Sequence, residues 1–179
     1  MYERIVAEMS VAAGESSVVY GSTQSGAVDE GSRRSLRLTP STESAELVVN
    51  KLLECKDRIA SHFGVELTEC EEPQFLRYKE GDFFVAHQDG NTGLLRLDTE
   101  RRRVSTVILL GRELDSPESA SLASNVYCGG SLVFTNLKTQ AKFRMVAKPG
   151  TLIAFRSETT HEVTPVTYGE RLSIVSWYR

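Results

Sequence analysis

The strongest constraint on the fold comes from the chain after residue 73, where short runs of β-forming residues follow one another closely. Each run is rich in Val, Ile, Leu, Phe, Thr or Tyr, and most are bounded by Gly, Pro or charged turns. No helical pattern alternates with these runs, which argues against βαβ units and favours an antiparallel sandwich or barrel. Pro165 predicts an edge or a bulge within its run. The expected strands span residues 74–79, 83–88, 103–110, 131–136, 142–147, 151–155, 161–166 and 171–178.

One helix is predicted before the strands, over residues 42–63. Its apolar residues recur at spacings of three and four, which gives one apolar face. Residues 39–42 supply capping residues, and Gly64 follows the last apolar position. Residues 1–40 are Ser- and Gly-rich in their middle, and we expect an irregular lead-in there.

The length of 179 residues fits a single domain. We therefore expect one mainly β domain over residues 1–179, with an N-terminal helix. In this division, residues 1–73 form the lead-in and the supporting helix, and residues 74–178 form the β core.

Composition excludes several classes of protein. Charged residues make up 25% and hydrophobic residues 40% of the chain, unlike a disordered sequence. Three cysteines without a C-x-x-C pair indicate neither a disulfide scaffold nor a zinc ribbon. No apolar run approaches the roughly 20 residues that span a bilayer, and the N-terminus lacks a signal-peptide profile. We therefore expect a cytoplasmic protein without a membrane partner.

Two further classes are disfavoured. A net charge of −3 and an aromatic content of 8% argue against a nucleic-acid partner. Neither a G-x-S-x-G motif nor a P-loop occurs, so a serine hydrolase and a P-loop nucleotide-binding protein are not supported.

The chain contains three histidines, and two of them fall in the predicted β region. His87 and Asp89 lie at a strand end, where residues i and i+2 point to the same face. His161 opens another predicted strand. Two histidines and one carboxylate are typical of non-haem Fe(II) oxygenases. The alternative is a simple turn at Asp89 beside a half-buried His87. His62, at the end of the predicted helix, is interpreted as structural.

The motifs around these residues occur in an ordered series. Tyr78 and Gly81 precede the His87-x-Asp89 pair, and an R-x-x-T strand follows at residues 103–106. Next come Gly129-Gly130 with Phe134, then 148–155, then His161-x-Val-x-Pro-Val-x-x-Gly-x-Arg171, and finally Trp177. Over residues 74–178 this series resembles the prolyl 4-hydroxylase-like branch of the Fe(II)/2-oxoglutarate-dependent dioxygenases.

The resemblance implies a double-stranded β-helix (jelly roll) and a set of site residues. His87, Asp89 and His161 would be the catalytic residues that bind Fe(II). Arg171 would pair with the distal carboxylate of 2-oxoglutarate, which suits its planar fork. Ser173 would hold the same carboxylate, and Tyr78 would line the cosubstrate pocket.

The sequence departs from the branch at Leu110, where many members carry a tyrosine that binds the same carboxylate. Ser173 or Thr151 could supply the missing donor. Trp177 is interpreted as a core residue.

The activity implied is hydroxylation of a C–H bond in a peptidyl (prolyl-like) or free amino-acid substrate, with release of succinate and CO2. Fe(II), 2-oxoglutarate and O2 would be required, with ascorbate as a further candidate. The loops predicted at 89–102 and 111–129 are candidates for determining the substrate. The arginines at 96 and 101–103 would meet an acidic peptide or a carboxylate substrate, or would lie on a solvated loop.

Three alternatives stay open at the level of sequence. The chain could be an oxidative demethylase of nucleic acid, another small-molecule oxygenase, or a non-catalytic jelly-roll binding protein. An inactive relative would usually have lost a metal ligand or the arginine, whereas all four positions are filled here. The sequence leaves the oligomeric state open.

Overall fold

The computed structural model describes residues 2–19, 28–91, 97–120 and 125–179. Its helices are α1 (Tyr2–Val11), α2 (Thr42–Phe63) and the single turn α3 (Leu97–Glu100), with a 3-10 turn at Pro117–Ala120. The strands are β1 (Gly14–Ser16), β2 (Arg33–Arg34), β3 (Leu36–Leu38), β4 (Gln74–Tyr78), β5 (Phe83–His87), β6 (Val104–Leu109), β7 (Arg112–Leu114), β8 (Val126–Gly129), β9 (Leu132–Thr135), β10 (Lys142–Met145), β11 (Leu152–Arg156), β12 (His161–Val163), β13 (Val166–Gly169) and β14 (Arg171–Tyr178).

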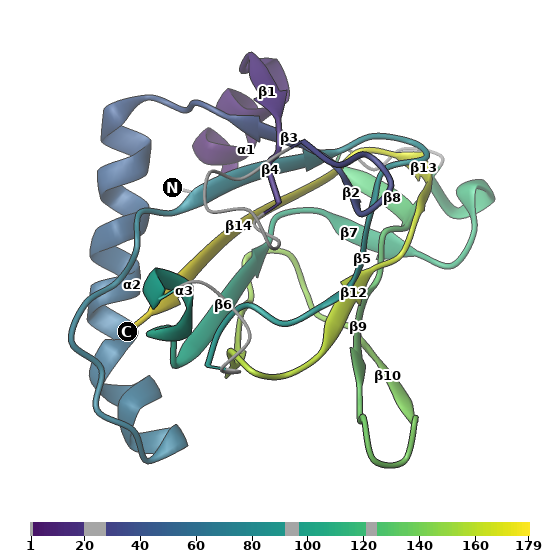
Figure 1. Cartoon of the computed structure of the whole chain (residues 1–179). Coiled ribbons are helices and arrows are strands. Elements are labelled where there is room, and N and C mark those ends of the chain that lie inside the picture. Colours follow the sequence, from purple (N-terminus) through teal and green to yellow (C-terminus); the bar gives the residue numbers. More distant parts are fainter. Residues whose placement is uncertain (1, 20–27, 92–96, 121–124) are drawn as a thin grey trace.

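The strands form two main sheets with a smaller one beside them (Figure 1). The six-stranded sheet has the order β1-β3-β4-β14-β6-β11, and the five-stranded sheet has the order β10-β9-β12-β5-β2. A three-stranded sheet, β13-β8-β7, contains the parallel pair β7–β8. All the other strand pairs in these sheets are antiparallel. The fold is a double-stranded β-helix, as predicted.

Strand β14 lies at the centre of the six-stranded sheet and faces two environments. Leu172, Ile174 and Tyr178 belong to the core cluster shared with α1 and α2. The Tyr178 hydroxyl also donates a hydrogen bond to the carbonyl oxygen of Leu52 in α2, at 2.6 Å. The alternate residues, including Arg171 and Ser173, line a cavity between the two main sheets. The helices therefore support the sheet from outside, while the opposite face carries the polar residues.

Helix α2 has the predicted bounds and ends. The Ser41 hydroxyl accepts a hydrogen bond from the backbone N–H of Ser44, which satisfies one of the free donors of the first turn. At the other end, Gly64 has φ 62°, the left-handed conformation that closes a helix at low cost.

The expected irregular lead-in is wrong over much of residues 1–40. Helix α1 buries Ile5 and Met9 in the core cluster, and β1, β2 and β3 extend the two main sheets. These strands have two or three residues each, too few for an alternating pattern. Strand β2 depends on pairing with β5, β3 on pairing with β4, and β1 on pairing with β3. The Ser- and Gly-rich stretch at residues 20–27 lies outside the described residues.

The two predicted loops are also partly ordered into elements. The first contains α3, and the second contains β7 and β8. Strand β8 is held by pairing with β7 and with β13, which is distant in sequence. Pro165 separates β12 from β13, in agreement with its predicted disruptive effect. Among the described residues, no helix is long and apolar enough to cross a membrane.

Candidate active site

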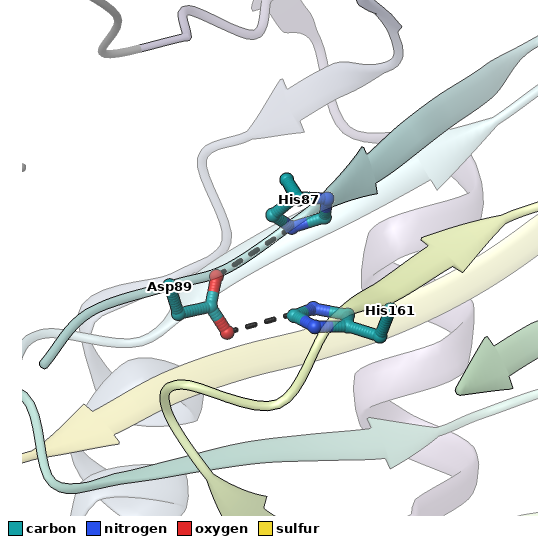
Figure 2. A group of neighbouring side chains, drawn as sticks. All are labelled: His87, Asp89 and His161. Carbon is teal, nitrogen blue, oxygen red and sulfur yellow. Dashed lines mark ion pairs between the residues drawn. The ribbon is translucent and has the colours of Figure 1, made fainter. Parts of the chain in front are cut away.

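His87, Asp89 and His161 come together between the two main sheets. Their potential ligand atoms all lie within 4.8 Å of one another, so the group could hold a metal ion. Figure 2 shows the Asp89 carboxylate beside the two imidazoles, with one oxygen directed toward each ring. Its oxygens lie 3.6 Å from Nε2 of His87 and 3.5 Å from Nε2 of His161. Two histidines and one carboxylate are the donor set typical of non-haem Fe(II), so these residues fit that metal.

Strand pairing brings the two histidines face to face. His87 ends β5 and pairs with His161, which opens β12. Asp89 follows β5, and the backbone N–H groups of Asp89 and Gly90 both donate to the carbonyl oxygen of Ser157, at 2.9 and 3.1 Å. Ser157 belongs to the turn that leads into β12, so one turn fixes both sides of the site.

Each imidazole is oriented through its second ring nitrogen. Nδ1 of His87 lies 2.8 Å from the carbonyl oxygen of Val85, and Nδ1 of His161 lies 2.9 Å from that of Thr159. A carbonyl oxygen can only accept, so Nδ1 donates in both contacts and Nε2 is the ring nitrogen directed toward Asp89. Metal-binding histidines are commonly oriented in this way.

The protonation states also suit a metal. Burial lowers the pKa of His161, and the nearby Asp89 carboxylate only partly opposes this effect. The imidazole is therefore neutral at neutral pH. Burial alone raises the pKa of Asp89, but His161, His87 and the Ser105 hydroxyl outweigh it and hold the pKa well below its usual range. A carboxylate and a neutral imidazole are the forms that bind a metal ion.

Arg171 lies in the same cavity and is 2% exposed. Its Nη1 donates a hydrogen bond to the Ser173 hydroxyl at 2.7 Å, and its guanidinium lies 5.2 Å from the ring centre of Tyr78. Tyr78 is the cross-strand partner of Arg171 and also lines the cavity. The Nε of Arg171 is buried without a hydrogen-bond partner. All six predicted site residues thus surround one cavity.

Glycine gives Arg171 its space. Gly130 has φ 58°, and a Cβ at this position would lie 3.0 Å from Cδ of Arg171. The sequence motif at 129–130 therefore has a physical reason, since any side chain would press on the arginine. The hydroxyl of Tyr127, a residue that sequence reasoning missed, interacts with Arg171 as well.

The departure at Leu110 has a structural explanation. Its side chain packs in the core cluster with the helices, away from the cavity. Leu109 instead lies opposite Ser173 in the sheet. Of the two donors considered, Ser173 lines the cavity, whereas Thr151 is not among its lining residues.

The predicted basic cluster does not act as a unit. Arg102 pairs with Glu71 through two hydrogen bonds of 2.8 and 2.7 Å, and its guanidinium lies 3.7 Å from the ring of Trp177. Its Nη1 also donates to the carbonyl oxygen of Asp89 at 3.3 Å. Trp177, predicted as core, lines the cavity. Arg101 and Arg103 are exposed, and Arg96 lies outside the described residues.

Sequence reasoning missed one further charged residue in the cavity wall. Arg33 lies in β2, within the supposed lead-in, and is only 8% exposed. A pair of basic residues in a Ser-rich stretch gives no signal for burial, because the position depends on the pairing of β2 with β5.

Fold and site together define a class: a double-stranded β-helix with a two-histidine, one-carboxylate metal site and a buried arginine in the same cavity. Residues 73–179 match the family model described as the 2OG-Fe(II) oxygenase superfamily. The chain therefore belongs to that superfamily, whose members use Fe(II), 2-oxoglutarate and O2. The predicted resemblance to the Fe(II)/2-oxoglutarate-dependent dioxygenases is thus confirmed.

Similar sequences include two bacterial PKHD-type hydroxylases. The protein from Shewanella oneidensis is 34% identical over 110 residues, which cover 59% of this chain and 41% of the relative. The protein from Burkholderia thailandensis is 28% identical over 158 residues, which cover 88% of this chain and 65% of the relative. The chain thus spans less than two thirds of the length of these relatives.

Similar folds occur among solved prolyl hydroxylases. A Pseudomonas putida prolyl-4-hydroxylase superposes with a TM-score of 0.64 at 21% identity, covering 100% of this chain and 98% of the other. A Trichoplax adhaerens prolyl hydroxylase, solved with a hypoxia inducible factor peptide fragment, gives a TM-score of 0.65 at 16% identity. That match covers 99% of this chain and 77% of the other.

Proposed function

We propose that this protein is a 2-oxoglutarate-dependent hydroxylase in which His87, Asp89 and His161 hold Fe(II). Arg171 and Ser173 bind the distal carboxylate of 2-oxoglutarate, and Tyr78 lines its pocket. The reaction hydroxylates a C–H bond of a peptidyl prolyl-like residue or a free amino acid and releases succinate and CO2.

The observation that carries this proposal is the unpartnered Nε of Arg171 in the cavity that also contains the three candidate ligands. A buried donor without an acceptor is costly, so the site gains stability when an anion enters. No carboxylate forms an ion pair with Arg171 in the described part of the chain. The distal carboxylate of 2-oxoglutarate supplies such an anion.

Each residue has a defined task in this proposal. The bound Fe(II) supplies the chemistry that activates O2. His87, Asp89 and His161 hold it in one orientation, because their backbone neighbours fix both rings and the carboxylate. Arg171 and Ser173 orient the cosubstrate from the opposite sheet. The apolar residues that share the cavity, among them Leu132 and Val163, exclude water.

The choice of substrate class is supported by relatives. The similar solved structures include prolyl hydroxylases, one of them with a bound peptide, and the similar sequences include PKHD-type hydroxylases. An amino-acid or peptidyl substrate is consistent with both.

Anaerobic titration with Fe(II) tests the proposal directly. A metal-to-ligand absorption band should develop only when 2-oxoglutarate is added to the iron complex, and His161→Ala should abolish it. Arg171→Gln should leave Fe(II) binding intact while weakening 2-oxoglutarate binding by about tenfold or more. Iron binding without any effect of the cosubstrate would contradict the proposal. For the substrate, 2-oxoglutarate turnover is measured against amino-acid and peptide pools, and products are searched for a mass gain of one oxygen.

A further inference from the structure

Arg33 is a second buried arginine in the wall of the candidate active site. It lies in β2, at the edge of the five-stranded sheet, where it pairs with Phe84 of β5. Figure 1 shows β2 beside β5, which carries His87 and pairs on its other side with β12, the strand that carries His161. The same cavity is lined by Arg33 and by the three candidate metal ligands.

The guanidinium of Arg33 is held in place by neutral groups. Its Nε donates to the Ser35 hydroxyl at 3.0 Å, and that hydroxyl donates in turn to the Ser17 hydroxyl at 2.8 Å. Nη1 lies 3.4 Å from the carbonyl oxygen of Val18. The charged carbon lies 4.8 Å from the ring centre of Phe84. These contacts fix the orientation of Arg33 but do not neutralise its charge.

Arginines that have a carboxylate partner provide a comparison. An ion pair with Glu or Asp is made by each of Arg4, Arg102, Arg144 and Arg179. Within the described ranges, Arg33 and Arg171 are buried, line the cavity and have no carboxylate partner. Because a buried charge without a counter-ion is expensive, both positions favour an anionic ligand.

Charge counting separates the two arginines. In the proposed function, Fe(II) and the Asp89 carboxylate together carry one positive charge, which one carboxylate of 2-oxoglutarate neutralises. The other carboxylate of 2-oxoglutarate neutralises the charge of Arg171. No anion is then left for Arg33. Arg171 belongs to the six-stranded sheet and Arg33 to the five-stranded sheet, so the two guanidinium groups approach the cavity from opposite walls.

Arg33 also lies on the metal side of the cavity. Phe84 contacts the guanidinium of Arg33, and the Phe84 ring stacks on the ring of His87 with centroids 3.6 Å apart. A ligand group bound by Arg33 is thus one aromatic ring away from a candidate metal ligand, the region where a substrate must present its C–H bond.

We propose that Arg33 binds a carboxylate of the substrate, so that the enzyme acts on a carboxylate-bearing molecule. The inference rests on the proposed function and narrows its substrate class. The carboxylate is either the α-carboxylate of a free amino acid or the acidic side chain of a peptide. Arg33 makes this anion a requirement for specificity, because its charge stays unpaired when a neutral analogue binds.

The test uses matched probes that differ only in the anion. Anaerobic protein loaded with Fe(II) and 2-oxoglutarate is titrated with L-proline against L-prolinamide, and with capped peptides in which Asp or Glu next to proline is replaced by Asn or Gln. Perturbation of the metal-to-ligand band and calorimetry report binding. The carboxylate form of one pair should bind at least about tenfold more tightly than its neutral analogue. A preference within the proline pair identifies the α-carboxylate of a free amino acid as the ligand, and a preference within a peptide pair identifies an acidic side chain.

Variants then assign the preference to Arg33. Arg33→Gln should abolish the difference between the paired probes while leaving 2-oxoglutarate affinity within about twofold, because Arg171 is intact. Arg34→Gln is the matched control, since its exposed side chain stacks on Phe83 and should change neither quantity. Arg33→Lys retains the positive charge without the planar fork of arginine, so it should keep a reduced preference for the carboxylate-bearing probe. This variant provides the test if Arg33→Gln does not fold.

The outcomes are distinct from those for the proposed function. Loss of the band with 2-oxoglutarate contradicts the oxygenase itself. If the metal-to-ligand band is normal but no carboxylate-bearing probe binds more tightly than its neutral analogue, the proposed role of Arg33 is wrong. A preference that survives Arg33→Gln overturns it equally.

Discussion

The imidazole of His87 stacks on the ring of Phe84, with centroids 3.6 Å apart and an angle of 17° between the planes. The two residues are three apart in β5, yet they lie on one side because the register of β5 against β12 shifts between them. His87 pairs with His161 and Phe84 with Val163, so β5 has one residue more than β12 in this interval. Such a bulge re-aims side chains.

Phe84→Leu should therefore weaken Fe(II) binding, since His87 loses the ring that restricts its orientation. We expect a loss of about tenfold, as for other groups that orient a metal ligand. Anaerobic calorimetry measures the affinity. Phe83→Leu is the control, because Phe83 points to the other face and contacts Arg34. Equal losses in both variants would contradict the role of the stacking.

Ser173→Ala should weaken 2-oxoglutarate binding by about tenfold, because Nη1 of Arg171 loses the acceptor that orients it. The shift of the metal-to-ligand band with cosubstrate concentration measures this affinity. Ser176→Ala is the comparison variant, since the Ser176 hydroxyl donates to Glu71 on the other face of β14. It should cost about 1 kcal/mol of stability and leave cosubstrate binding unchanged. If Ser176→Ala weakened 2-oxoglutarate binding and Ser173→Ala did not, this role of Ser173 would be ruled out.

Gly130→Ala should impair cosubstrate binding as well as stability. The new Cβ meets Arg171 at 3.0 Å and Val166 at 2.9 Å, in a left-handed backbone. Gly150→Ala is matched to it, because Gly150 has φ 81° and its Cβ would meet only Tyr2, at 3.7 Å. Both variants should lose about 1–2 kcal/mol from backbone strain, as thermal unfolding reports. Only Gly130→Ala should also raise the Kd for 2-oxoglutarate, and an unchanged Kd there would show that Arg171 has room to move.

Arg102→Gln should destabilise the protein and loosen the metal site. It removes the ion pair with Glu71, the contact with Trp177 and the hydrogen bond to the Asp89 carbonyl oxygen. The pair is largely buried, so we expect a loss of about 2–3 kcal/mol in denaturant unfolding, together with weaker Fe(II) binding. The exposed neighbour Arg101 provides the control, and Arg101→Gln should stay within about 0.5 kcal/mol of the wild type. Similar losses of unfolding free energy in Arg102→Gln and Arg101→Gln would contradict this role of Arg102 and indicate a general effect of removing a positive charge.

Acid should weaken the connection between α1 and α2 through Glu8. Hydrogen bonds from the Ser41 hydroxyl, then from Arg4, lower the pKa of Glu8 from 4.5 to about 2. Because the folded pKa is depressed, this stabilisation is complete above pH 4.5 and disappears as the pH falls toward about 2. The Tm of Glu8→Gln should thus lie below that of the wild type at neutral pH and converge with it over this range. A difference in Tm between Glu8→Gln and the wild type that stays constant over this pH range would disprove the linkage.

The sequence predicts the elements whose pattern is local. Helix α2 has a long apolar face and clear capping residues at Ser41 and Gly64, so its bounds are recovered. The six predicted site residues are brought to one cavity because alternation along a strand already determines which side chains share a face. Arg171 and Ser173, two residues apart in β14, illustrate this directly.

What the sequence does not predict depends on distant partners. Strand β2 has two residues, and only its pairing with Phe83 and Phe84 shows that Arg33 is buried. The bulge in β5 is equally invisible, since it is a property of the register with β12. Arg102 looks like part of a solvated basic loop until Glu71 and Trp177, both remote in sequence, are seen beside it.

The pairing of His87 with His161 also has a consequence for the folding of the chain. Metal coordinated by both side chains would connect two strands that are far apart in sequence, as a covalent cross-link does. Because such a metal binds the assembled triad and not the unfolded chain, it favours the native state by mass action. Iron would then protect the backbone amides of β5 and β12 from hydrogen exchange more than those of the outer strands β1 and β10. The metal-bound triad would in this way stabilise the pairing of β5 with β12 in the five-stranded sheet.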